Sequence, residues 1–178
     1  MRESFALIAG GGTAGHLYPG LAVAEALVSL GKRRNEIHFF TSDREIDNKL
    51  LTAADFHFTP LEGNGLTRRN ISSSIGAVIL LIKSTLFASR YVRKSKPKVI
   101  LALGGFAAVP GSVAGLLTGT PVVLHEQNSV PGSANKLISK WVKKSAVSYH
   151  NTKLPRRINT GNPVRKEITD LDSSDKSM

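Results

Sequence analysis

Residues 4–16 of the chain read SFALIAGGGTAGH, a short apolar run followed by three glycines and the letters TAGH. The run from Ser4 to Ala9 has the length and composition of a buried strand, and the glycines allow the backbone to turn tightly after it. From Gly15 to Leu30 apolar residues recur at helical spacing, and Gly31 is a natural end for that helix. The stretch therefore predicts a strand, a glycine turn and a helix that starts at the turn.

The same alternation of short apolar runs and longer helical patterns continues along the chain. Further strands are predicted at residues 36–41, 56–61, 98–103, 121–124, 146–149 and 157–159. Helices are predicted at residues 42–51, where Ser42 or Asp43 would be the cap, and at 71–93, 109–117 and 131–139. Strands that alternate with helices through short links form a parallel sheet covered on both faces. We therefore predict an α/β fold with a doubly wound, Rossmann-like parallel sheet over residues 1–165. The polar segment 166–178 is expected to be a linker or the truncated start of another domain.

Composition narrows the class of protein. The chain has 178 residues, no cysteine and a formal net charge of +11. The absence of cysteine excludes disulfides, thiolate metal sites and cysteine nucleophiles. The first apolar run is too short for a signal peptide, and no run approaches the roughly 18 residues that a membrane-spanning helix needs. We expect a soluble, cytoplasmic domain whose excess positive charge either meets an anionic partner or forms a solvated basic surface.

The first glycine turn has the composition of a phosphate-binding loop. Gly10, Gly12 and Gly15 satisfy the pattern G-x-G-x-x-G, and the helix that follows offers unpaired N–H groups and the positive end of its dipole to an anion. His16 stands where a P-loop requires lysine. The pattern is also compatible with a dinucleotide-dependent oxidoreductase, in which Asp43 would bind the ribose. The turn thus indicates a phosphate cradle in either class of enzyme.

Three more polar motifs follow predicted strands. Residues 104–111 read GGFAAVPG and repeat the order of strand, glycine turn and helix start. Residues 125–128 read HEQN, and residues 160–165 read TGNPVR, whose final arginine could bind a diphosphate. Because the carboxyl ends of parallel strands meet at one edge of a sheet, we expect these motifs to line one crevice. Within it, His16 and Glu126 are available as a general base or as a partner for a sugar hydroxyl.

The segment from residue 71 to residue 98 combines apolar residues at roughly helical spacing with a strongly basic end. One interpretation is a core-facing helix whose basic end is solvated. The other is a surface that inserts into an anionic lipid leaflet, and one helix can serve both purposes with its two faces. Only 6% of the residues are aromatic and no nucleic-acid-binding signature is present, so nucleic acid is not an expected partner.

Taken together, the motifs resemble those of one family. Residues 10–16 (GGGTAGH), 19–22 (PGLA), 104–106 (GGF), 125–128 (HEQN) and 161–165 (GNPVR) are similar to the MurG family of bacterial N-acetylglucosaminyltransferases. The resemblance extends from about Phe5 to Lys166, with two departures: Ala14 where many members have glycine, and Phe106 where tyrosine is common. It implies the amino-terminal half of a GT-B architecture, in which two Rossmann-like domains face a cleft.

The resemblance also implies roles for individual residues. The catalytic residues would be His16 and Glu126. Contacts to the donor UDP-GlcNAc would come from Thr13, Ala14, Gly15, Asn128 and Arg165. Contacts to the diphosphate of the acceptor would come from Gly11, Gly12, Gly104, Gly105 and Phe106. The membrane would be contacted by Ile75, Ile79, Ile82, Phe87, Arg90, Arg93 and Lys94.

The implied reaction is an inverting glycosyl transfer, in which the 4-hydroxyl of MurNAc in lipid I attacks C1 of GlcNAc and UDP leaves, giving lipid II. The motifs require neither a metal nor an organic cofactor, because helix dipoles and arginine can stabilise the departing diphosphate. The implied partners are UDP-GlcNAc, lipid I, the anionic cytoplasmic leaflet of the cell membrane, where the protein would be peripheral, and a carboxyl-terminal donor domain. Without that domain we expect little transfer by this chain. A non-catalytic half that works with a separate carboxyl-terminal subunit is the alternative.

Overall fold

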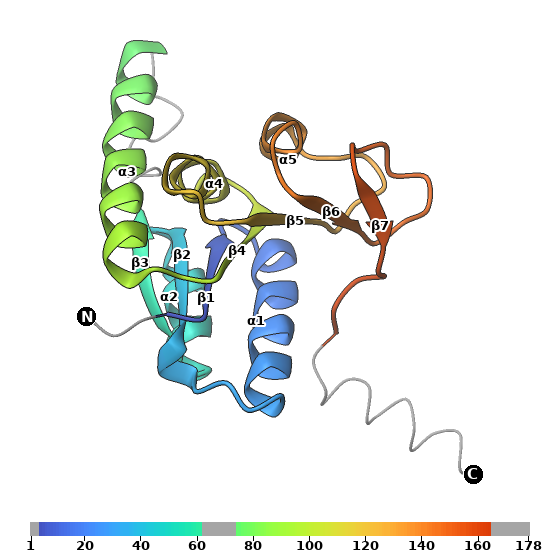
Figure 1. Ribbon diagram of the computed structural model, residues 1–178, viewed down its shortest axis with the longest axis horizontal. Coiled ribbons are helices and arrows are strands. Elements are labelled where there is room, and N and C mark those ends of the chain that lie inside the picture. The colour runs from blue at the N-terminus through green and yellow to red at the C-terminus, as the bar shows by residue number, and fades with distance from the viewer. Residues whose placement is uncertain (1–3, 62–73, 165–178) are drawn as a thin grey trace.

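The computed structural model describes residues 4–61 and 74–164, and for residues 74 and 75 it defines the helix but not the side chains. In these residues, seven parallel strands form one sheet in the order β3-β2-β1-β4-β5-β6-β7 (Figure 1). The strands are β1 (Ala6–Gly10), β2 (Ile37–Ser42), β3 (His57–Leu61), β4 (Val99–Gly104), β5 (Val122–Glu126), β6 (Lys144–Val147) and β7 (Arg157–Asn159). The arrangement confirms the predicted α/β fold with a doubly wound parallel sheet.

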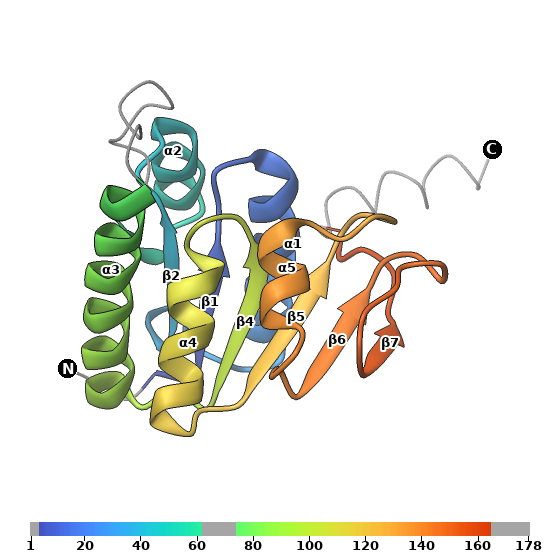
Figure 2. The same cartoon turned by 90° about the horizontal axis from the view of Figure 1, so that it is seen from above.

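Helices cover both faces of this sheet (Figures 1 and 2). One face carries α3 (Ser74–Ser95), α4 (Ala108–Thr118) and α5 (Ser133–Ile138), and the other carries α1 (Ala14–Ser29) and α2 (Glu45–Ala53). A short 3-10 turn, η1 (Arg34–Glu36), leads into β2. Side chains alternate along the central strand, so Leu7 packs with the core beneath α3, α4 and α5, whereas Ile8 packs with the core beneath α1 and α2. Burial on both faces explains why the central strands are continuous apolar runs in the sequence.

The carboxyl ends of the strands lie at one edge of the sheet, because every strand pairing is parallel. That edge carries the glycine turn after β1, the glycines at the end of β4 and residues 125–128 at the end of β5. The segment after β7 meets the same edge, since the carbonyl oxygen of Gly161 lies 3.2 Å from Nε2 of His125. The motifs that were expected to share a crevice therefore do come together.

Several predicted element boundaries differ from the observed ones by two residues or more, among them those of β6, α2 and α5. β6 begins at Lys144 rather than Ala146, because the Lys143 N–H already bonds the Val122 carbonyl and starts the pairing with β5. Neither Ser42 nor Asp43 caps α2, which begins at Glu45: Ser42 ends β2, and its hydroxyl donates to a carboxylate inside the helix. The third is α5, which is shorter than residues 131–139 and covers six residues.

Some predictions fall outside the described residues. These are the first turn of the helix expected from residue 71, the site residue Arg165 and the segment 166–178, so the domain boundary at residue 165 stays a prediction. Within residues 4–61 and 74–164, none of the helices combines the length and the hydrophobicity that crossing a bilayer requires.

The imidazole of His38 is held between the sheet and α3, and this environment predicts a pH effect on stability. Its ring centroid lies 4.7 Å from that of Tyr91, and its Nε2 lies 2.9 Å from Oγ1 of Thr59. Burial, helped by the charge of His57, lowers the pKa of His38 from 6.5 to about 4.

Between pH 4 and 6.5 the unfolded chain therefore binds more protons at His38 than the folded chain does. The stabilisation is present above pH 6.5 and is lost as the pH falls toward 4, by up to about 3 kcal/mol in the free energy of unfolding. Urea unfolding at a series of pH values should show this rise with pH, and H38Q should make it shallower. An identical slope in the variant would contradict the assignment.

Candidate functional site

The glycine turn after β1 leaves the start of α1 open to a ligand. Gly12 has a φ of 86°, which favours glycine, and Thr13 is the N-cap of α1 without making a side-chain cap. In the described part of the chain, the N–H groups of Ala14 and Gly15 make no hydrogen bond. Thr13, Ala14 and Gly15 are exposed or half-buried. Two unpaired donors at the positive end of a helix dipole form a favourable place for an anion.

The two glycine turns touch each other backbone to backbone. A Cβ atom placed on Gly105 would overlap the carbonyl oxygen of Gly11. A Cβ atom on Gly104 would lie 3.0 Å from Nε2 of His16 and 3.3 Å from Nδ2 of Asn135. His16 therefore lies over the second turn, and its other ring nitrogen, Nδ1, is 3.0 Å from Oγ1 of Thr13. Close contact through glycine is what brings the β1 turn, the β4 turn and α5 to one place.

Substitution of Gly105 should reveal this contact, because the chain contains a matched control. Gly105 and Gly119 both have a φ of 74°, but nothing lies within 4 Å of the Cβ position of Gly119. G119A should cost about 1–2 kcal/mol of stability, from left-handed backbone strain. G105A should cost about 1–3 kcal/mol more, since the carbonyl oxygen of Gly11 cannot rotate away. Urea denaturation of both variants measures the difference, and equal losses would show that the turns are not in contact.

Glu126 is completely buried, and both of its carboxylate oxygens are used. Oε1 accepts hydrogen bonds from the backbone N–H and the side-chain Nδ2 of Asn128, at 2.9 and 3.0 Å. Oε2 accepts from the Gly132 N–H at 3.1 Å and from Nδ2 of Asn135 at 2.7 Å. The carboxylate thus joins residues 125–128 (HEQN) to the start of α5. Its partner Asn135 lies beside Gly104 in the β4 turn, as His16 does.

His125 faces the opposite side of β5 and links that strand to the segment after β7. Its Nε2 faces the Gly161 carbonyl, and its Nδ1 lies 3.2 Å from Nε2 of Gln127. Burial lowers the pKa of His125, while the Gly161 carbonyl and the charge of Glu126 act in the opposite direction. The Thr152 hydroxyl donates to the Asn128 carbonyl oxygen and holds the HEQN loop from outside.

The remaining candidate positions are distributed as follows. Asn128 is exposed, and Phe106 is half-buried and packs against the core beneath α3, α4 and α5. The Gly12 N–H, expected to face a diphosphate, donates instead to the carboxylate of Asp47 at 2.7 Å. Arg165 lies outside the described residues. Among residues 4–61 and 74–164, no group of histidine and carboxylate side chains is arranged to hold a metal ion.

Sequence reasoning missed Asn135 and Asp47. Both are buried, and both belong to helices that meet the glycine turns only after folding. Asn135 has a further feature, because its Oδ1 is buried without a hydrogen-bond partner. A polar residue inside a short predicted helix was the available signal in each case, and it is a weak one.

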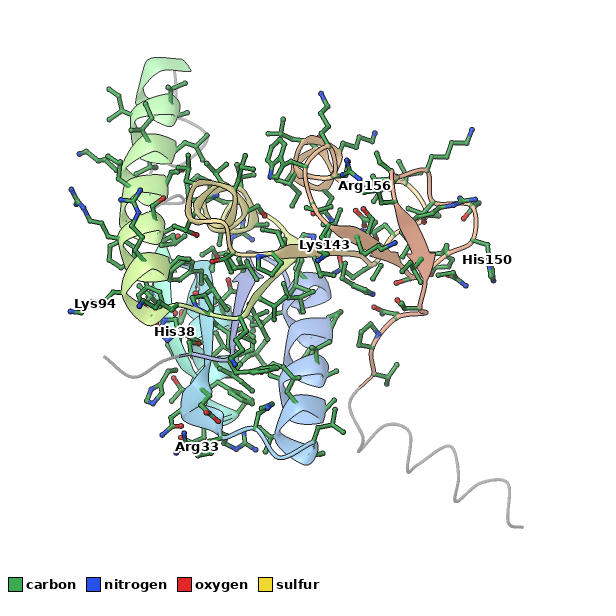
Figure 3. All side chains as sticks on the ribbon, viewed as in Figure 1. Arg33, His38, Lys94, Lys143, His150 and Arg156 are labelled. Carbon is green, nitrogen blue, oxygen red and sulfur yellow. The ribbon has the colours of Figure 1, made fainter. Side chains whose placement is uncertain are left out.

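Helix α3 presents one continuous stripe to the exterior. Ile79, Ile82 and Leu86 are 49%, 52% and 52% exposed, and Arg90 and Arg93 continue the same helical face. Lys94 lies at the outer side of the domain (Figure 3). The apolar half of the stripe is nearest the carboxyl ends of the strands, because α3 runs antiparallel to them (Figure 2).

Two of the predicted membrane contacts are not included in this exposed stripe. Phe87 is 45% exposed, but its ring centroid is 6.2 Å from that of Phe40, so it also packs inward. The side chain of Ile75 lies outside the described part of the chain. Exposed apolar residues beside the predicted contacts include Val78 and Leu86 on α3 and Leu116 and Leu117 on α4.

Residues 6–147 match the model of the glycosyltransferase family 28 N-terminal domain. The chain belongs to this family. This family 28 domain is 36% identical over 168 residues to the UDP-N-acetylglucosamine–N-acetylmuramyl-(pentapeptide) pyrophosphoryl-undecaprenol N-acetylglucosamine transferase of Acidovorax ebreus, covering 94% of the chain and 41% of the relative. It is 37% identical over 174 residues to the protein of the same name from Shewanella frigidimarina, covering 96% and 47%.

Solved structures agree with the family assignment. MurG of Acinetobacter baumannii superposes on the family 28 domain with a TM-score of 0.75 and 28% identity, covering 92% of this chain and 46% of that one. The UDP-bound structure of Staphylococcus aureus MnaA, at 14% identity and a TM-score of 0.65, shares the fold. The chain thus spans about half the length of the curated relatives it matches. The family favours a glycosyltransferase over the dinucleotide-dependent oxidoreductase.

Proposed function

We propose that this chain is the acceptor half of an inverting N-acetylglucosaminyltransferase. The enzyme would transfer GlcNAc from UDP-GlcNAc to the 4-hydroxyl of MurNAc in lipid I, giving lipid II for peptidoglycan synthesis. The observation that carries the proposal is the convergence of His16, the β4 glycine turn and the HEQN loop at one sheet edge in a glycosyltransferase family 28 domain. Ligands of open α/β sheets bind at this edge.

His16 is the proposed general base. When Nδ1–H donates to the Thr13 hydroxyl, Nε2 carries the lone pair and can accept the proton of the acceptor hydroxyl. The deprotonated O4 forms a bond to C1 of GlcNAc from the face opposite UDP. The bond from C1 to the diphosphate oxygen breaks as the new bond forms, so UDP leaves with the electron pair and the configuration at C1 inverts.

Glu126 fits a positioning role better than proton transfer. Each of its oxygens already accepts two hydrogen bonds, and the residue has no exposed surface. It would hold Asn128 toward the donor and Asn135 beside His16. The unpaired N–H groups of Ala14 and Gly15, with the α1 dipole, would stabilise the negative charge of a diphosphate.

The stripe on α3 is the proposed membrane contact, on the cytoplasmic face of an anionic membrane. Exposed isoleucines and leucine would enter the interface while the arginines and Lys94 meet lipid phosphates. The apolar half of the stripe is nearest the catalytic edge, and a lipid-linked acceptor would therefore reach that edge from the membrane. The donor domain would be supplied by a carboxyl-terminal region or subunit like the half of the relatives that this chain does not cover.

A complementation assay tests the function. The purified 178-residue chain is incubated with UDP-GlcNAc and a lipid I analogue, with and without the carboxyl-terminal half of the Acinetobacter baumannii protein. We expect transfer with both halves and little or none with either half by itself. Robust turnover by this chain by itself would contradict the proposal that transfer needs a separate donor half. Tight NADH binding with no response to UDP-GlcNAc or the acceptor would favour the oxidoreductase instead.

A further inference from the structure

The peptide units on both sides of Gly12 are fixed by side chains from the segment between β2 and α2. The Gly12 N–H donates to Oδ2 of Asp47 at 2.7 Å, and Nη1 of Arg44 donates to the Gly12 carbonyl oxygen at 2.7 Å. The Ser42 hydroxyl donates to the same Oδ2 at 2.6 Å. A turn with a positive φ at Gly12 is thus held from a neighbouring strand and helix rather than by its own sequence.

Asp47 is an unusual residue to bury. It has no exposed surface, and among the described residues no cation lies within ion-pair distance of it. Its Oδ1 has no hydrogen-bond partner. Its position in the first turn of α2 provides a favourable helix dipole, but a buried carboxylate with one orphaned oxygen still costs stability. An asparagine would accept the same two hydrogen bonds without a buried charge, so the cost of the carboxylate points to a role for its charge in the turn.

We propose that Asp47, assisted by Arg44, is a positioning residue that shapes the glycine turn and directs phosphate groups to Ala14 and Gly15 rather than to Gly12. A phosphate placed on the Gly12 N–H would have to displace the Asp47 carboxylate or meet it at close range, and two anions repel at that distance. The N–H groups of Ala14 and Gly15 make no hydrogen bond in the described residues and face no such competitor. The inference rests on the proposed function in one respect, which is that a phosphate binds at this turn.

The role differs from the expectation that Gly11 and Gly12 contact the acceptor diphosphate. Asp47 supplies a fixed negative charge behind the turn, and the unpaired donors are the N–H groups of Ala14 and Gly15, which follow Thr13. The glycines then allow the turn to adopt its conformation and the two turns to approach each other closely, and the start of α1 binds the phosphate.

The test uses the 178-residue chain, with three variants compared with the wild type. D47A removes the carboxylate clamp on the Gly12 N–H, and D47N keeps an acceptor oxygen there without the charge. D43A is the matched control, since Asp43 is an exposed aspartate just before the helix that carries Asp47. Amide hydrogen exchange by NMR reports the Gly12 N–H. Titration with inorganic pyrophosphate reports which amides shift.

In the wild type, pyrophosphate should shift the Ala14 and Gly15 amides more than Gly12. D47A should speed exchange at Gly12 by about tenfold or more, since a hydrogen bond to a charged group is lost. It should also weaken pyrophosphate binding by about fivefold or more, because the turn loses its shape. D47N should keep the affinity within about twofold of the wild type, because an acceptor oxygen for the Gly12 N–H remains. The pyrophosphate shift in D47N should extend to Gly12, because the repelling charge is gone, and D43A should change neither readout.

Unchanged exchange at Gly12 in D47A would overturn the clamp, and so would a pyrophosphate shift centred on Gly12 in the wild type. If D47A does not fold, the comparison of D47N with the wild type decides, because a pyrophosphate shift that stays off Gly12 in a folded D47N would contradict the exclusion of phosphate by the Asp47 charge. A wild-type chain that binds no pyrophosphate would count against the proposed function, while the exchange measurement would still test the clamp.

Discussion

H16A is expected to lower kcat of the complemented enzyme by about 10²- to 10⁴-fold, the range that a positioned general base contributes. KM for UDP-GlcNAc should change little, because His16 is proposed to act on the acceptor hydroxyl. The measurement is steady-state transfer to a lipid I analogue in the presence of the carboxyl-terminal half, across a range of pH.

Two further variants separate catalysis from folding. T13V removes the hydroxyl 3.0 Å from Nδ1 of His16 and should lower kcat by about tenfold, because the ring loses its fixed orientation. H150A replaces an exposed histidine whose ring contacts Asn159 rather than the glycine turns, and it should leave kcat unchanged (Figure 3). A folded H16A enzyme that kept more than about a tenth of wild-type kcat would exclude His16 as the base.

Charge reversal on α3 should strongly weaken membrane binding. R90E, R93E and K94E together remove three cations from the exposed stripe and add three anions. At about 1 kcal/mol for each basic residue near an anionic surface, removal by itself should weaken binding to phosphatidylglycerol-containing vesicles by about 100-fold. Vesicle co-sedimentation at low salt measures the effect, and high salt should abolish most of the wild-type binding.

The matched control carries the same change in charge elsewhere. Lys136, Lys140 and Lys143 are exposed on α5 and the segment after it, and reversing them should have a much smaller effect. L86S should weaken binding to neutral and anionic vesicles alike, since Leu86 is 52% exposed in the apolar part of the stripe. Equal loss of binding in the α3 and α5 triple variants would show that net charge, rather than this surface, drives the association.

The sheet could be predicted because its central strands are buried on both faces and glycines mark their ends. β1 and β4 illustrate this, since each is an apolar run that ends in a glycine turn. β6 was misplaced because Lys144 is polar, although in the folded chain it pairs with Val123 and the Lys143 N–H bonds the Val122 carbonyl oxygen. The start of α2 was misplaced because Ser42, a good cap by composition, uses its hydroxyl for Asp47.

The candidate site was predictable where it is local in sequence, and not where it depends on long-range contacts. The glycine turns and the HEQN loop are contiguous motifs, and the parallel topology brings them to one edge. Asp47 is 35 residues from Gly12, and no spacing rule links the two. Likewise, periodicity marks the apolar residues of α3, but packing against α4 and the sheet decides which of them face outward, as Leu86 does.

The position of β1 between β2 and β4 also has a consequence for synthesis of the chain. Its register aligns Ala6 with Ile37 on one side and with Val99 on the other. At typical ribosomal rates, roughly 3 to 12 s pass between the emergence of those two partners. During this interval one edge of an entirely apolar strand has nothing to pair with. The unpaired apolar edge makes a nascent chain prone to aggregate at this stage, and a chaperone that shields apolar segments would act in these seconds.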